Sequence, residues 1–169
     1  MKKIFISLVS LLVFTSCVLH VYRFTSVNYN NSRISISAGL VNSEDEKSPV
    51  EYIGVSDVRS NVNTPHKVKI LSSTIKIIDS NNKEYIAKTN SNSGYIHIYK
   101  QGVVITDDFK AYIGKVQLDD GTIIDIPPLL FKKTVYVERY SVISDTINAG
   151  GRGKKIFSGT VENYKKQKK

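Results

Sequence analysis

The residues of this chain that are able to do chemistry are few and widely spaced. Two pairs of adjacent carboxylates, Asp107-Asp108 and Asp119-Asp120, are of the type that binds calcium or serves acid–base catalysis. Adjacent residues on a strand point to opposite faces, so neither pair converges on one site. Both pairs also have the composition of turns. We therefore expect turn residues at these positions and no hydrolytic site.

No nucleotide, metal or nucleophile signature is complete elsewhere in the sequence. Residues 150–155 superficially resemble a phosphate-binding loop, but Lys155 stands where a magnesium-binding hydroxyl belongs. The histidines at positions 20, 66 and 97 lie far apart, and one cysteine leaves no multi-cysteine zinc site. Motifs of serine hydrolases and zinc proteases are absent. The sequence predicts no cofactor, no metal and no nucleotide, and it indicates a protein that is not an enzyme.

One strand-like segment is a possible binding patch. Residues 94–100 alternate, which places Tyr95, His97 and Tyr99 on one face and two isoleucines on the other. Such a face is either a ligand-contacting patch or an ordinary solvent-side ladder of a sheet. The 10 tyrosines against 6 phenylalanines fit both interpretations, because tyrosine suits pleated surfaces and binding interfaces alike.

The first residues have the organisation of an export signal. Lys2 and Lys3 precede an apolar run over 4–14, which is shorter than the roughly 20 residues that span a bilayer. The segment Phe14-Thr15-Ser16-Cys17 follows and resembles the lipobox of bacterial lipoproteins, with phenylalanine in place of the usual leucine.

The resemblance to lipoproteins implies that residues 1–16 are a signal peptide and that Cys17 is the lipidated N-terminus of the mature chain. Two or three acyl chains hold a protein stably on a membrane. We expect a lipid anchor in the cell membrane or outer membrane, with the domain on the extracytoplasmic (periplasmic) side. The alternative is a buried, unmodified thiol in an uncleaved or differently cleaved chain.

Positive charge is concentrated near the end of the chain. The 169 residues include 24 Lys and Arg against 15 Asp and Glu, and removing residues 1–16 leaves a net charge of +7. Seven of the basic residues fall in 152–169. This segment either lies against anionic headgroups or is a frayed, solvated terminus. We expect 146–169 to be a basic, flexible tail, and we expect no nucleic-acid binding, because aromatic residues do not interleave with the basic ones.

The segment 17–145 has the pattern of strands throughout. Period-two alternation of Ile, Val, Thr and Tyr in 33–41, 94–100 and 134–140 predicts half-buried strands. Turn residues recur at about ten-residue intervals, which is typical of an antiparallel sandwich or barrel. We predict an all-β fold, an antiparallel β-sandwich of the immunoglobulin-like or transthyretin-like kind.

One hairpin can be placed in register from the sequence. A three-residue loop at 80–82 pairs Ile77 with Tyr85, whereas a two-residue loop would set Asp79 against Glu84, two like charges. The three-residue loop is therefore the prediction.

A second hairpin follows the same rule. A loop at 119–121 with Gly121 left-handed pairs Val116 with Ile124. Neither residue of Pro127-Pro128 can donate to a ladder, so the strand ends there and the chain changes sheets.

Two classes of function remain. The favoured one is a membrane-anchored, non-catalytic binding or assembly module for a protein or a cell-envelope component. The alternative is an envelope enzyme that acts on peptidoglycan or lipid. A deep polar pocket lined by at least two converging carboxylates or histidines would favour the enzyme, and a shallow surface would favour binding.

Overall fold

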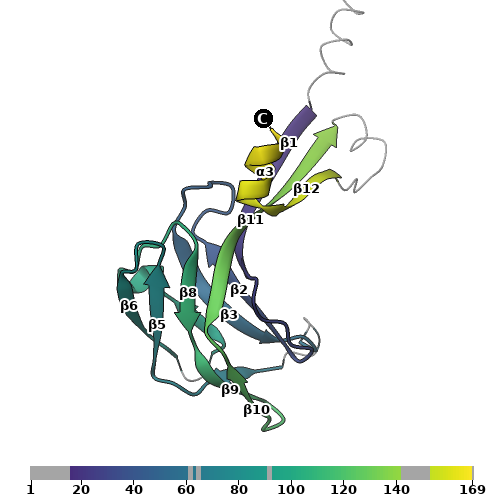
Figure 1. The fold of residues 1–169 in the computed structure, drawn as a ribbon. Helices are drawn as coiled ribbons and strands as arrows, with labels where there is room; N and C mark the ends of the chain where they lie inside the picture. The colour runs from purple at the N-terminus through teal and green to yellow at the C-terminus, as the bar shows by residue number, and fades with distance from the viewer. Residues whose placement is uncertain (1–15, 61–62, 64–65, 91–92, 142–152, 169) are drawn as a thin grey trace, which may run out of the picture. The chain divides into compact units, whose positions relative to one another are not determined.

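The computed structural model describes residues 16–60, 63, 66–90, 93–141 and 153–168. Within them the fold is all-β and antiparallel, as predicted (Figure 1). The chain divides into two compact units. Unit 1 comprises the residues up to Val21 and those from Val135 onward, and unit 2 comprises Tyr22–Thr134.

The structure contains twelve strands, one 3-10 turn and one helix in the described residues. They are β1 (Ser16–Ser26), β2 (Ile34–Leu40), β3 (Val50–Asp57), β4 (Val68–Ile70), β5 (Thr74–Asp79), β6 (Glu84–Lys88), β7 (Tyr95–His97), the 3-10 turn η1 (Tyr99–Gln101), β8 (Phe109–Tyr112), β9 (Gly114–Leu118), β10 (Ile123–Ile126), β11 (Leu129–Ser141), β12 (Lys154–Thr160) and α3 (Val161–Gln167).

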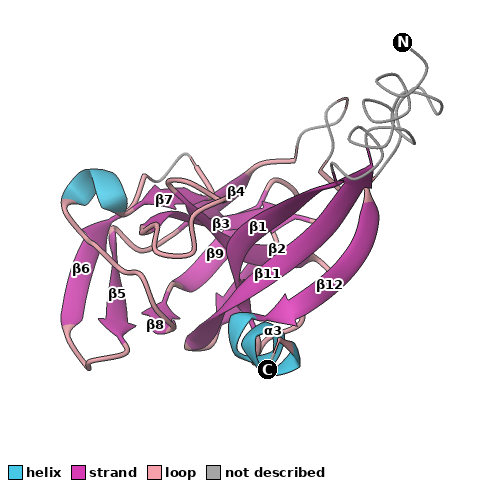
Figure 2. Ribbon diagram, turned by 90° about the horizontal axis from the view of Figure 1, so that it is seen from above, coloured by secondary structure: helices cyan, strands magenta, loops and turns pink. Residues whose placement is uncertain are grey.

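Two antiparallel sheets are formed by these strands. The larger has the order β6-β5-β8-β11-β1-β2-β3-β7, with β12 paired to β11, and the smaller has the order β10-β9-β4. Figure 2 shows β6, β5 and β8 side by side at one end of the larger sheet. The prediction of a two-sheet, antiparallel architecture is confirmed.

Three phenylalanines pack together in the core of unit 2, which otherwise consists mostly of isoleucine, valine and leucine. Phe24, Phe109 and Phe131 are almost fully buried. The rings of Phe109 and Phe131 stack with centroids 4.7 Å apart, and Phe24 meets Phe109 edge-to-face at 5.3 Å. Buried aromatic pairs of this geometry add to the free energy gained by burying their apolar area. The three rings come from β1, β8 and β11, so their packing joins these strands.

The predicted hairpin between β5 and β6 is confirmed in register. Ile77 pairs with Tyr85, and the amide of Asp79 donates to the carbonyl of Lys83 at 3.0 Å. Asn82 has a positive φ of 61°, which asparagine tolerates better than most residues. Avoiding a contact between the like charges of Asp79 and Glu84 was therefore enough to predict the loop length.

The predicted hairpin between β9 and β10 is also confirmed. Val116 pairs with Ile124, and Gly121 has a φ of 84°. The strand β10 ends directly before Pro127-Pro128, and β11, which begins at Leu129, belongs to the other sheet. The two prolines thus mark the change of sheet.

A single side chain bridges the two outer strands of the larger sheet, β6 and β7. The Nε2 of Gln101 donates to the carbonyl oxygens of Lys88 and His97, both at 2.9 Å. Its Oε1 accepts from the amide of Lys88 at 2.7 Å. The carboxamide of Gln101 therefore takes the place of backbone partners for Lys88 and His97.

Unit 1 differs from the expected flexible tail. Residues 154–167 form β12 and the helix α3, and α3 packs directly against β12 (Figure 2). The side chain of Thr160 caps α3 by accepting from the amide of Asn163. A helix of seven residues is too short to show a helical period in sequence, which is why the prediction was wrong here. Residues 146–152 lie outside the described part of the chain.

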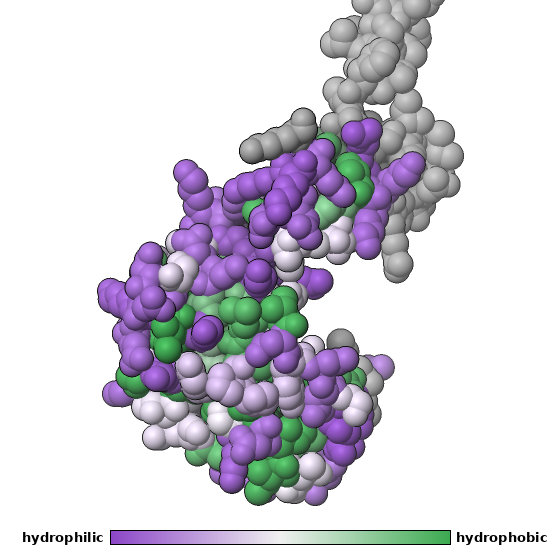
Figure 3. Space-filling model, in the orientation of Figure 1, coloured by the Kyte–Doolittle hydropathy of each residue, from purple (hydrophilic) through white to green (hydrophobic). Residues whose placement is uncertain are grey.

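Two aromatic contacts fix α3 within unit 1. The hydroxyl of Tyr164 lies 2.8 Å from Nε2 of His20 in β1, and its ring packs on Phe157 in β12 with centroids 5.1 Å apart. Figure 3 shows hydrophilic side chains over α3 on the face in view. The helix therefore contacts its unit through the half-buried Tyr164 and the buried Val161, and its charged residues are exposed.

Candidate functional site

Three aromatic side chains lie side by side on strands β3 and β7. In register, Tyr52 pairs with His97 and Gly54 with Tyr95. The ring centroids of Tyr52 and Tyr95 are 5.4 Å apart and those of Tyr52 and His97 are 6.1 Å apart, both edge-to-face. We call Tyr52, Tyr95 and His97 the aromatic patch.

Glycines form the floor of the aromatic patch. A Cβ atom added at Gly39, which pairs with Tyr52, would lie 2.5 Å from the Tyr52 ring. A Cβ atom added at Gly54 would lie 2.9 Å from the Tyr95 ring. The rings thus lie directly over bare backbone, and any side chain at these positions would displace them.

The structure places the three residues predicted as a patch in two different elements. Tyr95 and His97 share the exposed face of β7, and Tyr95 is 47% exposed. Tyr99 lies in η1, because the strand ends at His97, and is therefore outside the ladder. Tyr52 was missed, since its strand pairing is not readable from the sequence. The glycines inside strand-like segments were the available signal.

A second polar cluster centres on the buried carboxylate of Asp57. Nη2 of Arg59 lies 2.6 Å from its Oδ2, and Nε lies 3.0 Å from its Oδ1. The side-chain hydrogen bond from Arg59 lowers the pKa of Asp57 to about 2, against the opposing effect of burial. Arg59 also reaches Asp119 at 3.4 Å.

The turn between β9 and β10 joins this cluster. Nδ1 of His66 lies 2.5 Å from Asp119, and Arg33 lies 2.6 Å from Asp120. Hydrogen bonds from Thr122, and then from Arg33, hold the pKa of Asp120 below its ordinary value. Asp119-Asp120 is thus a turn, as predicted. Its carboxylates also connect the β9–β10 hairpin to Arg59 and His66, which follow β3.

Asp57, His66 and Asp119 have the spacing of metal ligands but the surroundings of an ion-pair network. One ligand atom from each lies within 4.8 Å of the others. However, a guanidinium already occupies both oxygens of Asp57, and Asp119 faces an imidazole and the same guanidinium. A cation placed here would meet the charge of Arg59. The arrangement is therefore suited to holding loops together.

Two clefts on the β5–β6 side share the carboxylate of Asp79. Their volumes are about 260 and 300 Å³. Asp79 accepts from the amides of Lys83 and Asn81, and the backbone hydrogen bond from Lys83 is the main cause of its lowered pKa. Asp108, in the first cleft, accepts from the amide of Lys133 at 2.9 Å. Asp79 and Asp108 therefore cap backbone amides, whereas Asp107, in the second cleft, accepts from the hydroxyl of Thr106 at 3.1 Å.

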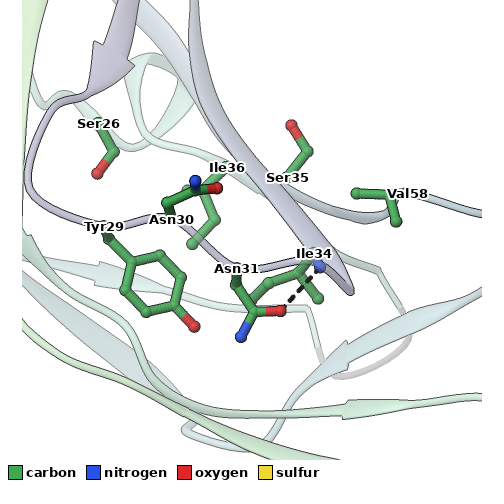
Figure 4. Close-up of a pocket in the computed structure, with 8 residues that line it drawn as sticks. All are labelled: Ser26, Tyr29, Asn30, Asn31, Ile34, Ser35, Ile36 and Val58. Atoms are coloured by element: carbon green, nitrogen blue, oxygen red, sulfur yellow. Dashed lines mark hydrogen bonds between the residues drawn. The ribbon is translucent and has the colours of Figure 1, made fainter.

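A third cleft, of about 250 Å³, has an uncharged lining (Figure 4). It lies between the β1–β2 connection and the strand β2, and its lining residues are Ser26, Tyr29, Asn30, Asn31, Ile34, Ser35, Ile36 and Val58. No candidate from the sequence falls in this cleft. The only hint there was the run of polar residues at 28–32 between two strands.

The lone cysteine, Cys17, lies in unit 1 near the start of β1, and its side chain is exposed. Comparison of the chain with protein families, with curated proteins and with solved structures finds no match in any of the three. None of the helices in the described residues is long and apolar enough to cross a membrane.

Proposed function

We propose that the chain is a lipid-anchored, extracytoplasmic lipoprotein that acts as a non-catalytic binding module and docks an envelope protein through the aromatic patch. The aromatic patch is the observation that carries the proposal. Rigid rings lose little conformational entropy on binding, and those of Tyr52 and Tyr95 lie against bare backbone at Gly39 and Gly54. Aromatic side chains are also enriched where protein interfaces draw most of their free energy.

Unit 1 supports the membrane anchor. Cys17 lies three residues before His20 in β1, so their Cα atoms are about 10 Å apart along the strand, and His20 contacts α3. Residues 135–169 carry 8 basic and 3 acidic residues. Basic residues near an anionic lipid surface add about 1 kcal/mol each. A lipid on Cys17 would therefore bring this positively charged segment close to the negatively charged headgroups.

The enzyme alternative has less support. An enzyme acting on peptidoglycan or lipid needs an acid and a base that converge and are free to exchange protons. In the described clefts Asp79 and Asp108 cap backbone amides, and Asp57 is held by Arg59. Binding is therefore the function that these groups favour.

The test is crosslinking of the full-length, lipidated protein in its own membranes, followed by capture. Tyr95→Ala removes a ring, and Gly54→Ala keeps Tyr95 but displaces it. We expect both variants to lose the crosslinked partner. Ile123→Ala, which truncates a side chain 56% exposed on β10, is the matched control and should keep the partner. Equal capture by all four proteins would contradict docking through the patch.

A further inference from the structure

The uncharged cleft beside β2 is built from the connection between β1 and β2. Ser26, Tyr29 and Asn30 come from the end of β1 and the segment after it, and Ile34 and Ile36 from β2 itself. Figure 4 shows the side chains of Tyr29 and Asn31 at its lower side and that of Ser26 at its upper left. We call this cavity of about 250 Å³ the β1–β2 cleft.

The polar groups of the β1–β2 cleft are largely unused. The Oγ of Ser26 is buried and has no hydrogen-bond partner. A buried hydroxyl left without a partner carries a cost in free energy. Within the described residues, the hydroxyl of Tyr29 and the carboxamide of Asn30 likewise make no hydrogen bond. The cleft therefore offers several donors and acceptors at once.

The backbone around these groups is held in place. The Oδ1 of Asn31 accepts from the amides of Arg33 and Ile34, which leaves its Nδ2 available as a donor. Asn28 accepts from the amide of Leu130 at 2.7 Å and donates to the carbonyl of Pro128 at 2.9 Å. A segment fixed in this way pays little ordering entropy when a ligand binds.

The chemistry of the lining selects the class of ligand. Carboxamides and hydroxyls both donate and accept, which matches the hydroxyls of a sugar ring. No charged side chain lines the cleft, so an ionic ligand would be desolvated without compensation. Ile34, Ile36 and Val58 supply an apolar wall for the C–H groups of such a ring.

We propose that the β1–β2 cleft binds one uncharged sugar unit of an envelope glycan. Its volume of about 250 Å³ lies just below the usual range of small-molecule sites, so it suits a single ring of a longer chain. The inference extends the proposed binding function to a second partner, and it uses no residue of the aromatic patch. The same sugar chemistry occurs in peptidoglycan and in other polysaccharides, and the two sources are separated by the test.

The test is saturation-transfer NMR on the detergent-solubilised full-length protein. One arm uses a tetramer of N-acetylglucosamine, which represents peptidoglycan, and the other uses a tetramer of glucose, which represents neutral polysaccharides. We expect transfer to at least one sugar, and the sugar that responds identifies the source. Absence of transfer to both sugars would overturn the proposal.

Variants tie the signal to the cleft. Tyr29→Phe and Asn30→Ala each remove hydrogen-bonding groups and should weaken binding about fivefold. Tyr99→Phe removes the same hydroxyl from an exposed tyrosine in η1 and should bind as the wild type does. Thermal unfolding checks that the variants fold. Wild-type affinity in both cleft variants would also overturn the proposal.

The two proposals can fail separately. Cleft variants should keep the crosslinked protein partner, and Tyr95→Ala should keep the sugar signal, because the two sites share no lining residue. Loss of the sugar signal in Tyr95→Ala would contradict an independent site.

Discussion

The two units use charge in opposite ways. Residues 22–134 contain 14 basic and 12 acidic residues, and several of them pair with one another, as Arg59 does with Asp57. Residues 135–169 contain 8 basic and 3 acidic residues. In unit 2, basic and acidic residues nearly balance, and ion pairs between them connect loops. In unit 1, basic residues are in excess. An excess of one sign attracts a surface of the opposite sign.

The units also differ in how deeply they bury aromatic rings. Phe109 and Phe131 in unit 2 are fully enclosed, while Phe157 and Tyr164 in unit 1 are half-buried. The free energy of unfolding should therefore depend mainly on unit 2, and location should depend on unit 1. The following predictions test that division.

The largest expected effect is on location. Cys17→Ser removes the sulfur that would carry the lipid, so the full-length protein should move from the membrane to the soluble fraction. Its melting temperature should stay unchanged, because Cys17 is exposed. Fractionation followed by immunoblotting measures the first outcome and thermal unfolding the second. Unchanged membrane retention would contradict the anchor.

The next effect is on stability, and it should differ between the units. Phe109→Ala removes a buried ring from a stacked pair and should lower the free energy of unfolding by about 3–5 kcal/mol. Phe157→Ala is the matched substitution in unit 1. It should lower the free energy of unfolding by about 1 kcal/mol, since the Phe157 ring is only half-buried. Urea denaturation of both variants measures the difference. Equal losses would show that unit 1 contributes as much as unit 2.

The acid sensitivity of unit 2 follows from Asp57. Its pKa is about 2 in the fold against 3.8 for the ordinary group, so ionisation stabilises the fold above about pH 3.8. This contribution is lost as the pH falls towards 2. Asp57→Asn should be less stable at pH 7 and should lose less stability between pH 4 and 2.

Denaturant titrations at pH 7, 4 and 2 measure the acid sensitivity of the wild type and of Asp57→Asn. Asp125→Asn, at an exposed carboxylate on β10, is the control and should behave as the wild type does. An Asp57→Asn variant with the pH profile of the wild type would contradict this role for Asp57.

The smallest effect concerns the excess charge of unit 1. In the unanchored Cys17→Ser background, Lys154→Gln should reduce partition onto vesicles that contain anionic phosphatidylglycerol by about fivefold at low salt. Higher salt should shrink the difference, because it screens the attraction. Lys115→Gln, at an exposed lysine of β9 in unit 2, should have little effect. Equal losses from both substitutions would remove the distinction between the units.

Local rules were enough to predict the hairpins from the sequence. A two-residue loop after Asp79 would place Asp79 opposite Glu84, two like charges. A two-residue loop in the second hairpin would place the apolar Val116 opposite the charged Asp125. One register therefore remains for each hairpin. Pro127-Pro128 predicted the change of sheet, because neither residue donates a backbone hydrogen bond. These predictions depend on neighbours within a dozen residues of sequence.

The features that the sequence did not predict depend on contacts between distant residues. Tyr52 and Tyr95 meet through the pairing of β3 with β7 across some forty residues of chain, and only that pairing places Tyr95 over Gly54. The helix α3 is held by Tyr164 against His20, 144 residues away in sequence. Short elements stabilised by such contacts have no periodicity of their own.

If the proposed lipid anchor holds the protein on a membrane, the carboxamide of Gln101 bears on how densely copies can be packed there. Anchored copies would diffuse in two dimensions and collide in a restricted set of orientations, so an unpaired strand would meet its counterpart often. Because Gln101 bonds to the backbone of both outer strands, neighbouring molecules find fewer free amides and carbonyls with which to polymerise. At Lys88 and His97, Gln101 would thereby reduce edge-to-edge association between neighbouring copies.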